Sequence, residues 1–176
     1  KCRKSGLQPA LTILVATTQG LKMHGGVPVE EIKQPNLQGL AHGLANLDRH
    51  IHNLQGFGQT VLVCFNRYAA DTDEEIELCR KHCAEVGVPF AVNNAFNEGG
   101  AGAEELARLV VQTIDEHPSE PLRLAYDDDM SVEQKAEAVA RKVYGADGVT
   151  FSPAAKRMLQ RVQEMGISHY PVCIAK

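Results

Sequence analysis

The sequence predicts an α/β fold, in which flanking helices pack on a parallel sheet. Three short apolar runs rich in β-branched residues, at 11–17, 60–65 and 89–92, are typical of buried strands. Longer segments with apolar residues three or four apart separate or follow them, as in amphipathic helices. Because strand and helix patterns alternate, we expect parallel strands joined by right-handed crossovers.

The first strand, Leu11–Thr17, is a continuous apolar run, so we expect burial on both of its faces. A glycine-rich loop containing Lys22–Gly26 follows it. Leucine and isoleucine spacing then predicts a helix over Asn36–Gln55, which ends at Gly56. The second strand is expected at Thr60–Phe65.

A second helix is predicted over Asp71–Val86, with Asp71 or Thr72 as its N-cap and acidic residues in its first turn. The third strand is expected at Pro89–Val92. The turn Gly99–Gly102 then leads into a helix over Ala103–Glu116.

The rest of the chain is predicted to be smaller and mostly helical. Capping signals at Ser131 and Ser152 predict helices that run to Tyr144 and to about Met165. Short strands are expected at 122–126 and 171–175. A shift in composition near residues 118–121 predicts a sheet region with the ligand-binding edge at 1–118 and a smaller α/β region at 119–176.

Composition narrows the class of protein. The net charge of −4 and the pI near 6.0 argue against a nucleic-acid partner or a membrane surface, and no apolar run is long enough to span a bilayer. Five scattered cysteines fit a reduced, cytoplasmic compartment. Cys79, His82 and Cys83 share a predicted helix. We expect helix packing there and no metal site, because zinc normally needs three or four ligands and no matching cluster occurs elsewhere in the sequence.

Ligands of parallel α/β sheets bind beyond the carboxyl ends of the strands. Three predicted loops meet that description, at 18–26, 66–71 and 93–102. Their polar and aromatic residues are Lys22, His24, Asn66, Tyr68, Asn93, Asn94 and Phe96. Aromatic residues are scarce in this chain, and two rings at adjacent strand ends suit a flat ligand held by stacking. The alternative is that both rings cap the core.

Other motifs are less specific. The Gly99–Gly102 turn suits either an anion or a tight turn, and Asp127–Asp129 suits a cation or, more simply, a solvated turn. His50 and His52, two positions apart on a helix, diverge. No Gly-x-x-x-x-Gly-Lys-Ser/Thr motif occurs in the sequence, so if the protein uses ATP, its phosphate loop is expected outside this chain.

Several ordered segments resemble the formate–tetrahydrofolate ligases. They are ATTQGLKMHGG at Ala16–Gly26, NLDRHI at Asn46–Ile51, NRYAADT at Asn66–Thr72, EGGAG at Glu98–Gly102, YGADGV at Tyr144–Val149 and PVCIAK at Pro171–Lys176. The resemblance spans the whole chain. It implies an ATP-dependent ligase, cytoplasmic and tetrameric, that joins formate to tetrahydrofolate through formyl phosphate, with Mg²⁺ accompanying the nucleotide.

The resemblance also implies site residues. Tyr68 and Phe96 match the two aromatic residues that stack the folate ring in the family, and Ala69 and Val92 would line the same pocket. Further residues are implied at the active-site edge, namely Lys22, His24, Gly25, Gly26, Asn66 and Asn94. Many relatives have Phe-Pro at the positions of Tyr68 and Ala69, Trp at Phe96, and Arg at Gln19.

The resemblance implies as well that the chain is the central piece of a subunit about three times as long, inactive alone, with a P-loop-NTPase-like architecture. Two alternatives remain open: a noncatalytic α/β binding module, or another P-loop-like ATPase of the same broad fold.

Overall fold

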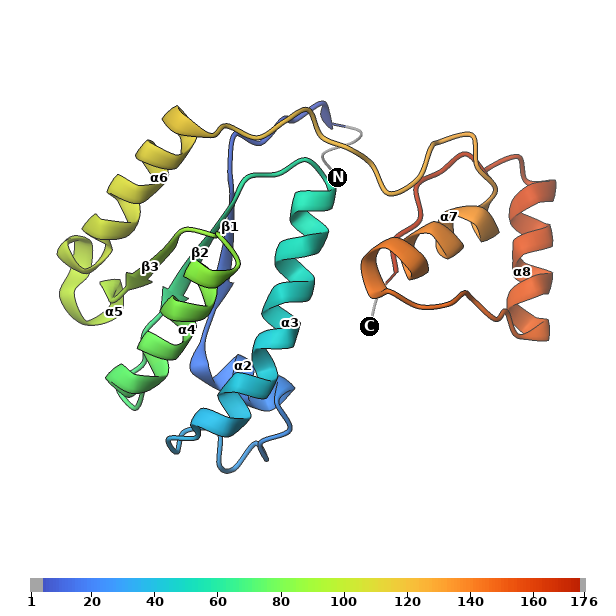
Figure 1. Cartoon of the computed structure of the whole chain (residues 1–176). Helices are drawn as coiled ribbons and strands as arrows, with labels where there is room; N and C mark the ends of the chain where they lie inside the picture. Colours follow the sequence, from blue (N-terminus) through green and yellow to red (C-terminus); the bar gives the residue numbers. More distant parts are fainter. Residues whose placement is uncertain (1–4, 175–176) are drawn as a thin grey trace. The chain divides into compact units, whose positions relative to one another are not determined.

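The computed structural model describes residues 5–174 and divides the chain into two compact units, residues 1–122 and 123–176, each described here by itself. The first unit contains three parallel strands in the order β1-β2-β3: β1 (Thr12–Ala16), β2 (Val61–Asn66) and β3 (Phe90–Asn93) (Figure 1). The predicted parallel α/β sheet is therefore confirmed. The P-loop-NTPase-like architecture and a domain boundary after residue 118 stay predictions.

Helices connect the strands and follow the last one. In chain order they are α2 (Thr18–His24), α3 (Leu37–Gly56), α4 (Asp73–Glu85), α5 (Ala95–Glu98), the 3₁₀ helix η1 (Gly99–Ala103) and α6 (Glu104–Glu116). The Thr72 side chain accepts a hydrogen bond from the Glu75 amide, and the Glu75 side chain accepts one from the Thr72 amide. This capping box explains why α4 begins just after Thr72.

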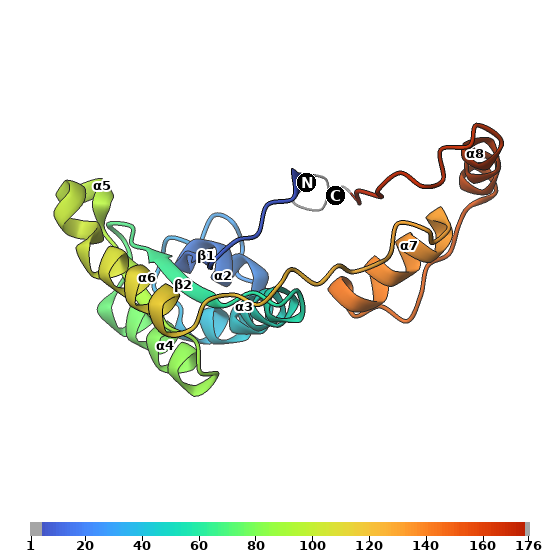
Figure 2. The same cartoon turned by 90° about the horizontal axis from the view of Figure 1, so that it is seen from above.

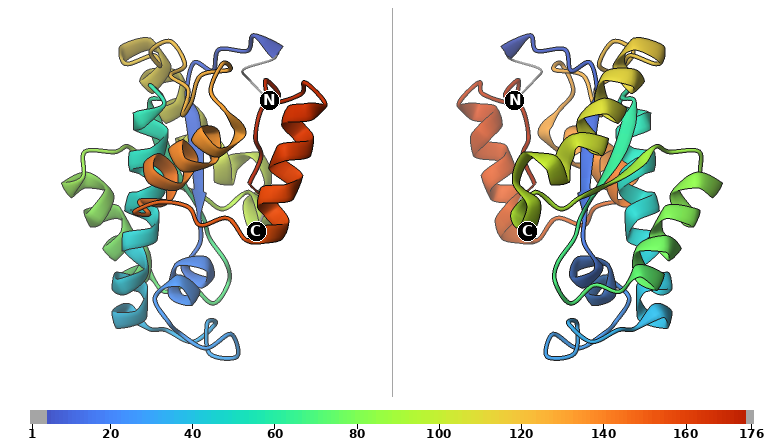
Figure 3. Two further views of the ribbon diagram at one scale, coloured as in Figure 1. Left: turned by 90° about the vertical axis from the view of Figure 1, so that its right-hand side faces the viewer. Right: turned by 90° about the vertical axis from the view of Figure 1, so that its left-hand side faces the viewer.

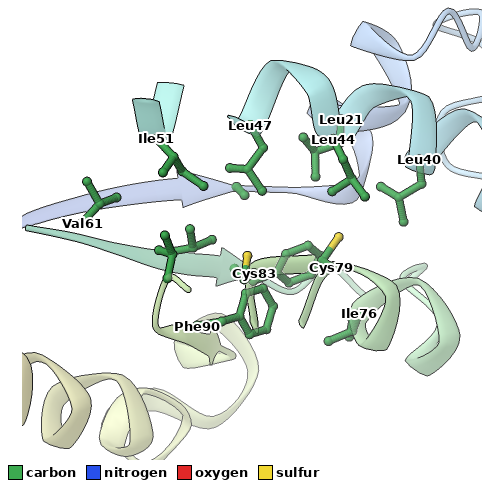
Figure 4. Close-up of a cluster of buried hydrophobic side chains, with 14 residues drawn as sticks. Leu21, Leu40, Leu44, Leu47, Ile51, Val61, Ile76, Cys79, Cys83 and Phe90 are labelled. Carbon is green, nitrogen blue, oxygen red and sulfur yellow. The ribbon is translucent and has the colours of Figure 1, made fainter. Parts of the chain in front are cut away.

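The core of the first unit lies between the sheet and helices α3 and α4 (Figure 4). One stripe of α3, with Leu40, Leu44, Leu47 and Ile51, packs on the face of the sheet that carries Phe65. Each of these leucines follows from the helical period seen in the sequence.

Helix α4 contributes Cys79 and Cys83 to this core, and both side chains are fully buried. Burial raises the pKa of Cys79 to about 12, with the neighbouring Cys83 and Glu75 adding to the effect. Burial, followed by the charge of Asp48, raises the pKa of Cys83 to about 11. His82 Nε2 points instead to Asp48 Oδ1, at 2.6 Å. The Cys-x-x-His-Cys segment therefore has a packing role.

The other face of the sheet is covered unevenly. Leu62 and Ala91 are completely buried there, and α6 packs against β2 and β3. In β1, by contrast, Ile13 and Val15 remain 43% and 55% exposed. The prediction that this strand is buried on both faces is wrong, because α6 covers β2 and β3 more than β1.

The second unit contains helix α7 (Val132–Val139), a π-helical turn η2 (Ala140–Tyr144) and helix α8 (Pro153–Glu164) (Figure 2). The capping signals at Ser131 and Ser152 are confirmed, since each hydroxyl accepts a hydrogen bond from the amide three residues on. The Lys135 ammonium is buried and donates to the backbone oxygens of Asp128, Ser168 and Tyr170.

Two expected strands, at 122–126 and 171–175, do not occur in the described residues. Residues 122–126 and the described part of 171–175, residues 171–174, are irregular. The Tyr126 hydroxyl donates to Val172 O at 3.0 Å and accepts from Val172 N at 2.9 Å. A side chain thus satisfies the backbone groups that a strand partner would otherwise take. In residues 5–174 no helix is long and apolar enough to cross a membrane.

Candidate functional site

The carboxyl ends of β2 and β3 are joined by an asparagine pair. Asn66 and Asn93 are register partners, and Asn93 Nδ2 donates to Asn66 Oδ1 at 2.9 Å. Asn93 Oδ1 then accepts from the Ala95 amide at 3.1 Å, which fixes the start of α5. The loops that follow the two strands are therefore tied to one another at the predicted ligand edge.

A buried aspartate ties the loop after β2 to the helix after β1. Asp71 Oδ1 accepts a hydrogen bond from the Thr18 hydroxyl, and Asp71 Oδ2 accepts from the Tyr68 amide at 2.8 Å. Thr18 is completely buried and Asp71 is 8% exposed, so this link is shielded from water. The sequence suggested Asp71 only as a helix cap. Its role in positioning the Tyr68 backbone depends on a residue 53 positions away.

The two predicted stacking rings are both open to solvent. Phe96, on the short helix α5, is 96% exposed, and Tyr68 is 46% exposed. Neither ring contacts another aromatic ring within residues 5–174. Ala69 is exposed, whereas Val92 is half-buried and packs against the core. An exposed phenylalanine ring in water is unfavourable, and a ligand or another surface that covers the ring gains hydrophobic free energy.

Asn94 holds the loop that carries Phe96. Its amide donates to Gly102 O at 2.9 Å, and its side chain bonds with Glu98 and Asn97 at 2.8 and 2.7 Å. A Cβ atom at Gly102 would lie 2.5 Å from Asn94 O, so only glycine allows this close return of the chain. The glycine-rich turn therefore has a structural explanation, and the asparagine side chain is already engaged.

Lys22 lies at the same edge but faces inward. The expected loop over residues 18–24 is instead helix α2, capped by Thr17, which continues directly from β1 (Figure 3). The Lys22 ammonium lies 2.9 Å from Glu75 Oε1 and 2.9 Å from Gln34 O, with its side chain 1% exposed. The three N–H donors of the Lys22 ammonium therefore already have two partners within the unit. An active-site role for Lys22 stays a prediction.

The Glu75 carboxylate is a buried junction. Burial by itself would raise its pKa, but hydrogen bonds from the Asn36 amide, the Lys22 ammonium and the Thr72 amide outweigh burial and lower the pKa. Glu75 is therefore ionised at neutral pH and ties α2, α3 and α4 together at one point.

Gly25 and Gly43 allow close packing of α2 and α3. A Cβ atom at Gly25 would lie 1.8 Å from Gly39 O, and one at Gly43 would lie 1.9 Å from Leu21 O. At Gly25 the backbone of α3 fills the space that a side chain would take, so this glycine has a packing role. Its place at the active-site edge stays a prediction. Gly26 has a φ of 87° and is open, and His24 is exposed.

The site that emerges is a hydrogen-bonded polar base whose loops carry two exposed rings. Asn66, Asn93 and Asp71 fix the backbone on which Tyr68 and Phe96 are carried. No three His, Cys, Asp or Glu side chains in the described residues form a group suited to a metal ion, and we assign no metal ligand to this chain. Such a base with exposed rings can hold a flat aromatic ligand by stacking.

The chain is similar to known proteins along its whole length. The family model for formate–tetrahydrofolate ligase matches residues 1–176. Proteins named formate–tetrahydrofolate ligase from Bacteroides fragilis, Bacteroides thetaiotaomicron and Porphyromonas gingivalis are 61%, 59% and 52% identical to the chain over 176 residues. Each alignment covers the whole of this chain and 32% of the relative, so the chain spans about a third of the length of these curated relatives.

Proposed function

The chain belongs to the formate–tetrahydrofolate ligase family, and we propose that it forms the folate-binding part of such an enzyme. The observation that carries this proposal is the exposure of Phe96 and Tyr68 at the carboxyl edge of the sheet. A pterin offers two flat faces, and each face would stack on one of these rings. Ala69 and Val92 would line the pocket beside them.

The complete reaction would join formate to tetrahydrofolate at the expense of ATP, through formyl phosphate, and release 10-formyltetrahydrofolate. The nucleotide and its Mg²⁺ would be held outside this chain, because the sequence has no P-loop motif to bind their phosphates. We propose further that the whole protein is a cytoplasmic homotetramer. The residues of this chain would bind and orient the folate, and keep its reacting edge in place.

A chimera tests the proposal. Residues 1–176 would replace the aligned third of the Bacteroides fragilis ligase, to which they are 61% identical. With ATP, formate and tetrahydrofolate, we expect the chimera to form 10-formyltetrahydrofolate and the isolated chain to form none. Product formed by the isolated chain in an ATP-dependent reaction would contradict the proposal that the nucleotide is held outside this chain. A chimera that folds, binds ATP and fails to bind folate contradicts the proposed folate role.

A further inference from the structure

A small cavity lies at the carboxyl end of β1, away from the proposed folate stack. Its volume is about 210 Å³, and it is lined by β1, α2 and α3. Because the strand order is β1-β2-β3, this cavity borders the strand at one edge of the sheet, whereas Phe96 follows the strand at the other edge. The inference below therefore does not depend on the folate proposal.

Four polar side chains line the cavity: Thr17, His24 from α2, and Asn46 and His50 from α3. The Thr17 hydroxyl already accepts a hydrogen bond from the Gly20 amide. Within residues 5–174, the side chains of His24, Asn46 and His50 form no hydrogen bond or ion pair with the protein. Asn46 is half-buried, so its amide loses part of its contact with water without gaining a protein partner. Polar groups in such a position are normally satisfied by a ligand or by ordered water.

The fold brings these side chains together by a specific packing arrangement. Asn46 and His50 are four residues apart on α3 and therefore lie on one face of that helix. Gly43, three residues before Asn46, lets the backbone of α3 approach Leu21 of α2, since a Cβ atom at Gly43 would lie 1.9 Å from Leu21 O. This close crossing brings His24, near the end of α2, to the same cavity.

The chemistry of the lining favours a negatively charged ligand. An imidazole ring carries an N–H donor in either neutral tautomer, and the Asn46 amide carries two donors. No aspartate or glutamate lines the cavity, and its remaining side chains are mostly small or apolar, among them Leu14, Leu21 and Leu47. Donors above an apolar floor, with no carboxylate in the lining, suit an oxyanion better than a cation.

We propose that this cavity binds a small oxyanion, a carboxylate or a phosphate, through His24, Asn46 and His50. The ligand would enter from solvent, because both histidines are exposed, and it would rest on the leucine side chains beneath. Carboxylate and phosphate share the acceptor oxygens that such donors recognise, and the experiment separates these two sources.

The test is an NMR titration of the 176-residue chain with its histidine rings labelled. Sodium formate and sodium phosphate would be added separately at constant ionic strength, with sodium chloride as the reference. We expect saturable shifts of the His24 and His50 ring signals with one of the two anions, and unchanged signals for His42 and His52. The anion that saturates these shifts at the lower concentration shows whether the cavity prefers a carboxylate or a phosphate.

Variants make the result specific. Asn46→Leu keeps the side-chain volume but removes both donors, and His50→Leu removes the ring N–H donor while preserving the helix; each should weaken binding about tenfold. His42→Leu, on the same helix but outside the cavity, should bind normally. The amide spectrum checks that each variant folds. The proposal is overturned if no saturable shift occurs, if all histidines shift equally, or if folded Asn46→Leu and His50→Leu bind as the unmodified chain does.

Discussion

The Lys22 ammonium lies 2.9 Å from Glu75 Oε1, and the two side chains are 1% and 0% exposed. This ion pair joins the helix after β1 to the helix after β2, at the edge where the predicted ligand site lies. Its position shows that one residue of the KMHGG segment supports the site from within.

Lys22→Met should destabilise the first unit strongly. The substitution leaves the Glu75 carboxylate buried without its charged partner, which typically costs about 3–5 kcal/mol. Urea unfolding followed by circular dichroism measures the loss, and Lys81→Met, at an exposed position on α4, is the matched control. The double variant Lys22→Met/Glu75→Leu should recover part of the stability. Equal midpoints for Lys22→Met and Lys81→Met would show that the pair contributes little.

Stability should fall in acid as Glu75 becomes protonated. The folded-state pKa of Glu75 is below its ordinary value, so its contribution is present above the unfolded pKa and is lost as the pH falls through the folded one. We expect the urea midpoint to decline from about pH 5 downward, since an unfolded Glu titrates near 4.3. Glu75→Gln should flatten this part of the curve. A decline of unchanged steepness in Glu75→Gln would assign the effect to other carboxylates.

Gly43→Ala should disrupt the crossing of α2 and α3. The added methyl group would lie 1.9 Å from Leu21 O, a backbone atom that cannot move without shifting α2. Overpacking of this kind costs about 1–3 kcal/mol or more. Gly56→Ala is the control, because its Cβ meets open space and alanine favours a helix by up to about 1 kcal/mol. A thermal melt that ranks Gly43→Ala as stable as Gly56→Ala contradicts the close-packing explanation.

Local signals in the sequence predicted most helix starts in both units. The capping residues Thr72, Ser131 and Ser152 act on neighbours three residues away, so the sequence alone identifies them. The parallel order of strands followed from their alternation with helices.

What the sequence could not predict depends on distant residues. Helix α2 contains Gly20 and ends beside two glycines, which indicates a loop until the packing of α3 is known. Likewise, a continuous apolar run does not show which face of β1 is covered. The interactions of Asp71 with Thr18 and of Glu75 with Lys22 each span 53 positions. Nothing in the local pattern marks these carboxylates as supports of the site.

The most direct test of the central claim is the folate affinity of the chimera carrying Phe96→Ala or Tyr68→Ala. Each ring should contribute about 0.5–1.5 kcal/mol by stacking in addition to its buried area, so each variant should bind tetrahydrofolate about tenfold more weakly, or worse. Both alanine variants should bind ATP as the unmodified chimera does. Phe96→Trp, which keeps an aromatic ring, should bind folate as the unmodified chimera does. Val86→Ala, at an exposed site before β3 and so at the opposite edge of the sheet, is the control. Unchanged folate affinity in both alanine variants, measured by calorimetry, would contradict the stacking site.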